Sequence, residues 1–175
     1  MEQQHHPSNG VLAIIGVIVA FWVCVTVVLL GIFKVHDTWP AFMVLVLFFL
    51  SGQDTKSFKN IFAGGAVGIL LAFGLVTGIG ILVPMGIGMT AATLILVAVA
   101  IFLIVALGGV ANIFFNNYAF IYFTIALIYA ADQNPVMWII TMLLGGAFLS
   151  GCILLSIKGL TSLMTRKTVG KDAGA

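Results

Sequence analysis

The sequence predicts an all-α integral membrane protein with six transmembrane helices arranged as two inverted three-helix repeats. Only 7% of the residues are charged, whereas a soluble domain carries about 25%. Hydrophobic residues make up 62% of the chain and gather in runs long enough to cross a bilayer. The segment 37–68 also has a fainter counterpart at 116–151, as expected of an internally repeated membrane protein.

The first predicted span is the continuous apolar run from Val11 to Phe33. At about 1.5 Å per residue, this run can cross a hydrocarbon core of about 30 Å. No Lys or Arg precedes it and no Ala-x-Ala site follows it. We therefore interpret it as a retained helix rather than a cleaved signal peptide, with residues 1–10 as a polar tail.

The second span begins at Trp39-Pro40, because proline suits the first turn of a helix and tryptophan suits the membrane interface. Its apolar run ends near Gly52 and is shorter than the hydrocarbon thickness. The third span covers 61–81 and is rich in glycine. Small residues let helices approach closely in lipid. The residues assigned to helix packing are Gly64, Gly65 and Gly68 here, and Gly145 and Gly146 in the sixth span.

The second half of the chain repeats this order, with predicted spans at 90–107, 118–131 and 135–157. The fifth span is again short and again ends in polar residues. In one register, Trp39, Ala41 and Asp54 fall on Asn117, Ala119 and Asp132. A slip of about three residues then places Gly64-Gly65 on Gly145-Gly146. The repeats are predicted at 11–81 and 82–158, followed by a basic tail at 159–175.

The distribution of Lys and Arg predicts the orientation. Six spans place both termini on one side, and a three-span unit forces the second repeat to be inverted relative to the first. The predicted terminal side carries Lys56, Lys59, Lys158, Arg166, Lys167 and Lys171. The opposite side carries Lys34 alone. Because positive residues are retained in the cytoplasm, both termini are predicted to be cytoplasmic.

The polar residues at the ends of the two short spans are the candidate solute site. Short hydrophobic segments at matching positions of two halves often mark a transport site. The predicted solute-binding residues are Trp39, Gln53, Asp54, Lys56, Lys59, Asn117 and Asp132. The two lysines would attract an anionic or polar solute, and Asp54 would orient a lysine. The alternative is that these residues form ordinary solvated loops and mark the cytoplasmic side.

Two further features leave alternatives open. Asn116 and Asn117 could form a polar pore mouth or cap the fifth helix. The tyrosines and phenylalanines of the fifth span could line a pathway for a flat solute or face lipid and the interface. The sequence shows no metal-ligand spacing, no catalytic arrangement and no basic stripe. We therefore expect no metal, no cofactor, no enzymatic activity and no nucleic-acid partner.

The stretch from Trp39 through Ser51, Lys56 and Lys59 to Gly64-x-x-x-Gly68 resembles a known hairpin. It is similar to the first conserved hairpin of the fusaric-acid-resistance and aromatic-acid-exporter superfamily, which includes the plant aluminium-activated malate transporters. It is also similar to a family of small six-helix bacterial inner-membrane proteins of unknown function. The resemblance implies a six-helix unit in a bacterial inner membrane, often dimeric, that moves organic anions or related small solutes. Those exporters carry an arginine just before the glycine motif, where this chain has Ile61-Phe62-Ala63.

Together these features predict a membrane channel or transporter for a small solute, with an organic anion as one candidate. Its pathway would lie between the two repeats, and the chain is expected to form a homo-oligomer in the lipid bilayer. The alternative is a non-transporting scaffold or assembly subunit, whose glycine-rich helix faces would serve association.

Overall fold

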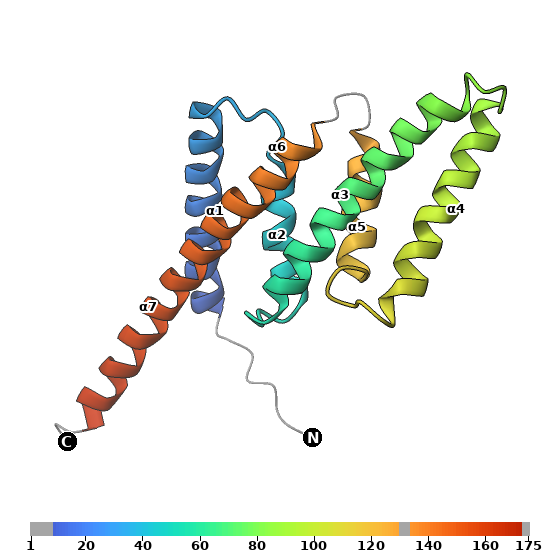
Figure 1. Ribbon diagram of the computed structural model, residues 1–175. Helices are drawn as coiled ribbons and strands as arrows, with labels where there is room; N and C mark the ends of the chain where they lie inside the picture. Colours follow the sequence, from blue (N-terminus) through green and yellow to red (C-terminus); the bar gives the residue numbers. More distant parts are fainter. Residues whose placement is uncertain (1–8, 130–133, 173–175) are drawn as a thin grey trace.

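The computed structural model describes residues 9–129 and 134–172, with side chains for 10–129 and 134–162. Every regular element in these residues is helical (Figure 1), which confirms the predicted all-α class. In chain order the elements are α1 (Asn9–Ile32), α2 (Trp39–Leu50), α3 (Ser57–Leu82), α4 (Met89–Gly108), α5 (Asn117–Ile128), α6 (Pro135–Ile140), the π-helix η2 (Thr141–Gly145) and α7 (Gly146–Asp172).

Four helical stretches of the described chain are long and apolar enough to cross a membrane. They are Gly10–Ile32, Ser57–Leu82, Met89–Gly108 and Pro135–Ser162. Helices α2 and α5 are also apolar but have 12 residues each, which gives each a length of about 18 Å. The chain is therefore a helical membrane protein with four long candidate spans. Complete crossing by α2 and α5 stays a prediction.

The last helical stretch is longer than the apolar run that predicted it. Segments α6, η2 and α7 follow one another as one rod (Figure 1). The backbone stays helical as far as Asp172 instead of ending near Ile157. The π-helix η2 widens this rod locally, and such insertions are rare in regular helices.

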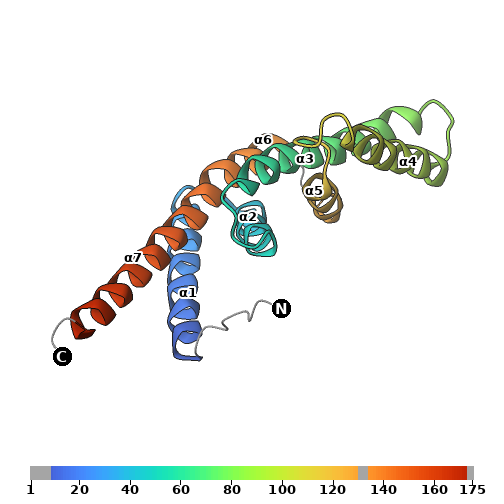
Figure 2. The same ribbon diagram turned by 90° about the horizontal axis from the view of Figure 1, so that it is seen from below.

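The helices form a curved layer with a second set on one side of it. Viewed from below, α7, α6, α3 and α4 make the curved row, and α1, α2 and α5 project from its concave side (Figure 2). Helix α3 packs against α5 and α4, whereas the rod of η2 and α7 packs against α2 and α1. The short helices α2 and α5 therefore lie in the middle of the fold.

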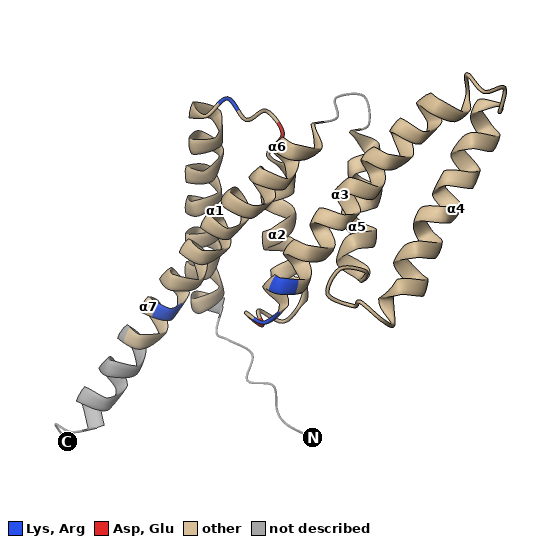
Figure 3. Ribbon diagram, viewed as in Figure 1, with Lys and Arg blue, Asp and Glu red and all other residues tan. Residues whose placement is uncertain are grey.

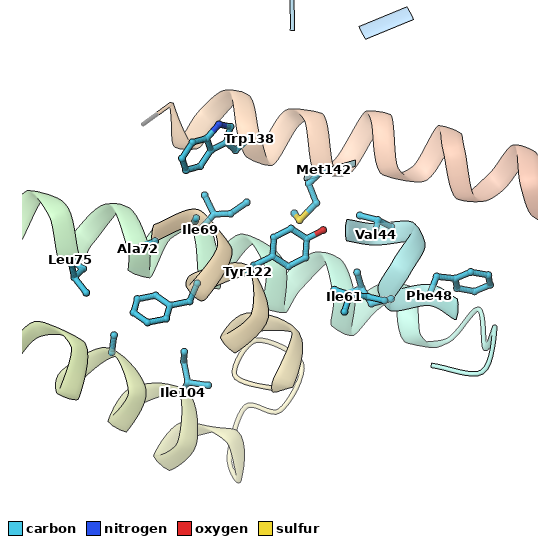
Figure 4. Packing of buried hydrophobic residues seen from close by; sticks show 14 residues of the cluster. Val44, Phe48, Ile61, Ile69, Ala72, Leu75, Ile104, Tyr122, Trp138 and Met142 are labelled. Atoms are coloured by element: carbon cyan, nitrogen blue, oxygen red, sulfur yellow. The ribbon is translucent and has the colours of Figure 1, made fainter. Parts of the chain in front are cut away.

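The main core forms where these helices meet. Tyr122, Trp138, Phe48, Ile61 and Met142 are all less than 2% exposed and belong to one apolar cluster. Figure 4 shows Tyr122 of α5 lying between α3 and Met142 of η2. Burial of large side chains favours packing by van der Waals contact in lipid, where there is little hydrophobic drive between helices.

Among the residues whose side chains the structure describes, the charged ones lie in the connections of α1 with α2 and of α2 with α3, in the first turn of α3 and within α7 (Figure 3). Lys56, Lys59 and Lys158 lie toward the end where α2 finishes and α3 begins, and all three are exposed. Lys34 and Asp37 lie at the other end, in the connection between α1 and α2. The described part of the chain between these ends is apolar or uncharged, as expected of a bilayer-spanning region.

Candidate functional site

The polar turn between α2 and α3 is exposed. Gly52 and Gln53 both adopt left-handed backbone angles, with φ of +73° and +62°, and this conformation favours glycine. The Asp54 carboxylate accepts a hydrogen bond from the Lys56 backbone N–H at 2.9 Å. Gln53, Asp54, Lys56 and Lys59 are all exposed. The structure thus places these predicted site residues on the solvent side of the turn, where Asp54 fixes the turn itself.

Asn117 lies beside an open pocket of about 510 Å³ at the same end of the molecule. The pocket is formed by the end of α2, the 108–116 connection and the start of α5. Its lining residues are Leu47, Leu50, Gly108, Asn112, Phe115, Asn116, Asn117, Tyr118 and Ile121. Asp132, the residue predicted to match Asp54, lies outside the described residues. The pocket combines an apolar wall with the amides of the 112–117 segment.

Asn116 holds this segment in place and caps α5. Its side-chain oxygen accepts hydrogen bonds from the backbone N–H groups of Tyr118 and Ala119, at 2.9 and 3.1 Å, as an N-cap residue does. Its amide nitrogen donates to the carbonyl oxygens of Asn112 at 2.9 Å and Asn60 at 3.3 Å. The capping alternative therefore applies to Asn116, and the bond to Asn60 ties the pocket wall to the first turn of α3.

Two tyrosines of α5 and the tyrosine at its C-terminal cap lie toward α2. Tyr118, Tyr122 and Tyr129 are spaced four and seven residues apart, so they share a helix face. Tyr118 lines the pocket with Leu47 of α2. Tyr122 is fully buried, and its hydroxyl donates to the Pro40 carbonyl oxygen at 2.9 Å. We call the region between these two helices, with Trp39, Leu47, Tyr118, Tyr122 and Tyr129, the α2–α5 seam.

An aromatic cluster closes the far end of the seam. The Trp39 ring stacks on Tyr129, with centroids 5.6 Å apart and planes 5° apart. The Trp138 ring meets Trp39 edge-on at 5.3 Å, an arrangement favoured by the ring quadrupoles. The Trp138 indole N–H donates to the Asp37 carboxylate at 2.7 Å. The Trp39 indole N–H is buried and has no hydrogen-bond partner among the described residues.

Sequence reasoning did not single out Asp37, Pro40 or Trp138 as parts of this site. The signal that could have found the seam is the tyrosine spacing within 118–129. That spacing separates the tyrosines that face α2 from Phe120, which is exposed on another face of the same helix.

The glycines predicted for packing lie at close helix contacts. A Cβ at Gly68 would meet the Ala119 carbonyl oxygen and, at 2.8 Å, the Phe123 backbone nitrogen. A Cβ at Gly65 would approach Met142 Sδ to 2.6 Å and the Tyr122 ring to 2.9 Å. Gly64 faces the Asn116 side chain in the same way. These glycines let α5, and with it Tyr122, sit directly on α3.

The glycines of the sixth predicted span meet α2. A Cβ at Gly145 would lie 3.0 Å from Ala41 Cβ, and one at Gly146 would lie 2.5 Å from Val44 Cγ2. Both glycines are buried. The rod of η2 and α7 therefore rests on α2 through small residues. No group of three or more His, Cys, Asp or Glu side chains suited to a metal occurs in the described residues.

A model for a family described as a protein of unknown function, DUF1097, matches residues 13–157. The chain belongs to the DUF1097 family. No curated protein and no solved structure matches the chain. The match spans α1 to α6, η2 and the start of α7, so the whole seam is part of the DUF1097 region. The family description names no activity.

Proposed function

We propose that this DUF1097 protein is a channel or transporter that moves a small solute along the α2–α5 seam. The proposal rests on one face of α5, which extends from the open pocket to the aromatic cluster at the other end. Tyr118 borders an open pocket, Tyr122 is buried one turn further along, and Tyr129 reaches the aromatic cluster at the other end. Short helices at the centre of a membrane protein are typical places for a solute site.

The contacts of the glycines support the predicted inverted repeat. The register that pairs Trp39 with Asn117 also pairs Val44 with Tyr122. Gly146 packs against Val44 and Gly65 packs against Tyr122. Corresponding glycines therefore meet corresponding residues of the short helices. The third helix of each proposed repeat rests on the short helix of the other, which supports a seam between the repeats.

Tyr122 closes the seam in this conformation. Its side chain is fully buried, and its hydroxyl is bonded to the first turn of α2. A net contribution of about 1 kcal/mol is typical of such a hydrogen bond, which is small enough to be exchanged for a bond to a passing solute. Opening the seam requires this side chain to move away from Pro40.

The charge distribution supports an orientation with the pocket on the cytoplasmic side of a bacterial inner membrane. Lys56, Lys59 and Lys158 lie at the pocket end and Lys34 at the other (Figure 3), and positive residues favour the cytoplasmic side. Exposed lysines near a mouth also raise the local concentration of anionic solutes, within about 10 Å at ordinary salt. Their proposed role is therefore attraction at the mouth, with Asp54 holding the turn.

The test measures solute flux in proteoliposomes for a variant in which a large substituted side chain fills the pocket. Asn117 is exposed and lines the pocket, so Asn117→Trp should block entry without disturbing the core. Phe120→Trp places the same side chain on an exposed position of α5 that does not line the pocket. We expect flux to fall strongly in the first variant and to persist in the second. Equal flux in both variants would remove the pocket from the pathway.

A non-transporting subunit is the second candidate, and the exposure of α1 favours it. Helix α1 packs on α7, yet Val17, Phe21 and Val28 are each more than half exposed, which leaves a surface for lipid or a partner chain. We further propose that the chain forms a homo-oligomer. Copurification of a fixed partner without flux of any solute would support the second candidate over the first.

A further inference from the structure

The polar groups that line the pocket are uncharged. Asn112, Asn117 and Tyr118 supply amides and a hydroxyl, and the other lining side chains are apolar apart from Asn116. Asn116 is engaged in capping α5, but the side-chain amides of Asn112 and Asn117 make no hydrogen bond to any described residue. An amide offers two donors and an acceptor. The pocket therefore presents free neutral donors and acceptors side by side.

The polar groups deeper in the seam are also uncharged. The next polar groups are the Tyr122 hydroxyl with the Pro40 carbonyl, followed by the unpartnered indole N–H of Trp39. The nearest acidic group along the cluster is Asp37, whose carboxylate is bonded to Trp138. Among the described residues, no charged side chain lines the pocket or belongs to the seam.

The helix ends around the pocket do not stabilise the negative charge of a bound anion. The α5 N-terminus would ordinarily attract an anion, but its Tyr118 and Ala119 N–H groups are already bonded to Asn116. The pocket is also bordered by Leu50 and Gly108, which lie at the C-terminal ends of α2 and α4. The partial negative charge of helix C-termini disfavours an anion.

We infer that the solute crosses the seam as an uncharged hydrogen-bonding molecule, such as a small amide or alcohol, rather than as an organic anion. This inference rests on the proposed transport function and narrows its substrate class. An isolated ion without a countercharge pays a desolvation cost of several kcal/mol or more. A neutral amide exchanges its hydrogen bonds with water for bonds to Asn112, Asn117, Tyr122 and Trp39. The exposed lysines do not line the pocket, and for this neutral solute they mark the cytoplasmic side rather than attract the solute.

The experiment compares matched neutral and anionic probes in proteoliposomes at neutral pH. Acetamide and acetate have nearly the same shape and differ in charge, and lactamide with lactate forms a larger pair. We expect influx of the amides to exceed that of protein-free liposomes. Influx of the radiolabelled anions should equal that of protein-free liposomes. The amide flux should be lost in Asn117→Trp and retained in Phe120→Trp.

Each outcome decides a different claim. Saturable influx of acetate or lactate that exceeds influx of the matching amide would overturn the neutral-solute inference and leave the transport proposal standing. Absence of flux for all four probes, and for a wider neutral and anionic panel, in folded protein would overturn the transport proposal itself. Amide flux that is unaffected by Asn117→Trp would overturn the assignment to this pocket.

Discussion

Gly68 on α3 and the glycine pair Gly145-Gly146 contact the short helices through different kinds of atoms. Gly68 of α3 faces backbone atoms of α5, at Ala119 and Phe123, whereas Gly145 and Gly146 face only side chains, those of Ala41, Leu30 and Val44. The second contact also coincides with the π-helix η2. A backbone contact cannot relax without moving a helix, whereas a side-chain contact can repack. The α3–α5 pair is therefore the fixed part of the fold, and the α2–η2 contact is the adjustable part.

The largest effect is expected at Gly68. In Gly68→Ala the new Cβ meets the α5 backbone, so the two helices must separate. Overpacking of this kind costs about 1–3 kcal/mol. We expect a clear loss of stability in a detergent unfolding titration. Gly74→Ala is the matched control on the same helix, because a Cβ there meets no atom within 4 Å. Equal stability of both variants would remove the distinction between the two contacts.

A smaller effect is expected at Gly146. The Cβ of Gly146→Ala would lie 2.5 Å from Val44 Cγ2, and this side chain can shift at a lower cost than the backbone that Gly68 faces. We expect a loss below that of Gly68→Ala, and recovery of stability in the double variant Gly146→Ala/Val44→Ala. The same unfolding titration measures both. Failure of the second substitution to restore stability would mean that the contact is not adjustable.

Removal of the Tyr122 hydroxyl should affect stability and flux in opposite directions. Tyr122→Phe loses the hydrogen bond to Pro40, which is typically worth about 1 kcal/mol. Because that bond holds the seam closed, we expect lower stability and a higher rate of solute flux. Tyr118→Phe is the control for stability alone, because the Tyr118 hydroxyl makes no bond to a described residue although the side chain lines the pocket. A Tyr122→Phe variant with reduced stability and unchanged flux would contradict its role in closing the seam.

The smallest effect is expected at Lys56. The side chain is exposed, so Lys56→Ala should leave the unfolding midpoint within experimental error. Flux of the neutral amide probes should equal that of the wild type at low and at high salt, because an exposed charge does not attract an uncharged solute. Loss of all flux in Lys56→Ala at any salt would restore this lysine as a binding residue, as first predicted from the sequence.

Much of the fold follows from local sequence signals. Hydropathy predicted the helices, and the spacing of Gly64, Gly65 and Gly68 predicted their packing role, because both depend on residues close together in the chain. The seam could not be predicted in the same way. The bond from Tyr122 to Pro40 joins positions 82 residues apart, and that from Trp138 to Asp37 joins positions 101 residues apart. Neither pair has a signal in its own neighbourhood.

The predicted polar site is the clearest example of this limit. Gln53, Asp54, Lys56 and Lys59 attracted attention because polar residues are rare in this chain. The structure exposes all four at the turn, whereas the uncharged Asn112 and Tyr122 lie in the pocket and the seam. Rarity of charge identifies where the membrane ends, but the lining of a pathway depends on which helix faces meet. That arrangement is a tertiary property.

The most direct test of the account asks whether water reaches the seam side of α5. Single cysteines would replace Tyr118, Ile121 and Tyr122 on the seam side, and Phe120 and Thr124 on the exposed side, in a Cys24→Ser/Cys152→Ser background. Labelling by a small water-soluble thiol reagent in membranes would then be measured. The account predicts labelling at 118, 121 and 122, slowest at buried 122, with 120 and 124 protected by lipid. Labelling of 120 and 124 with protection of 121 and 122 would contradict a pathway along the seam.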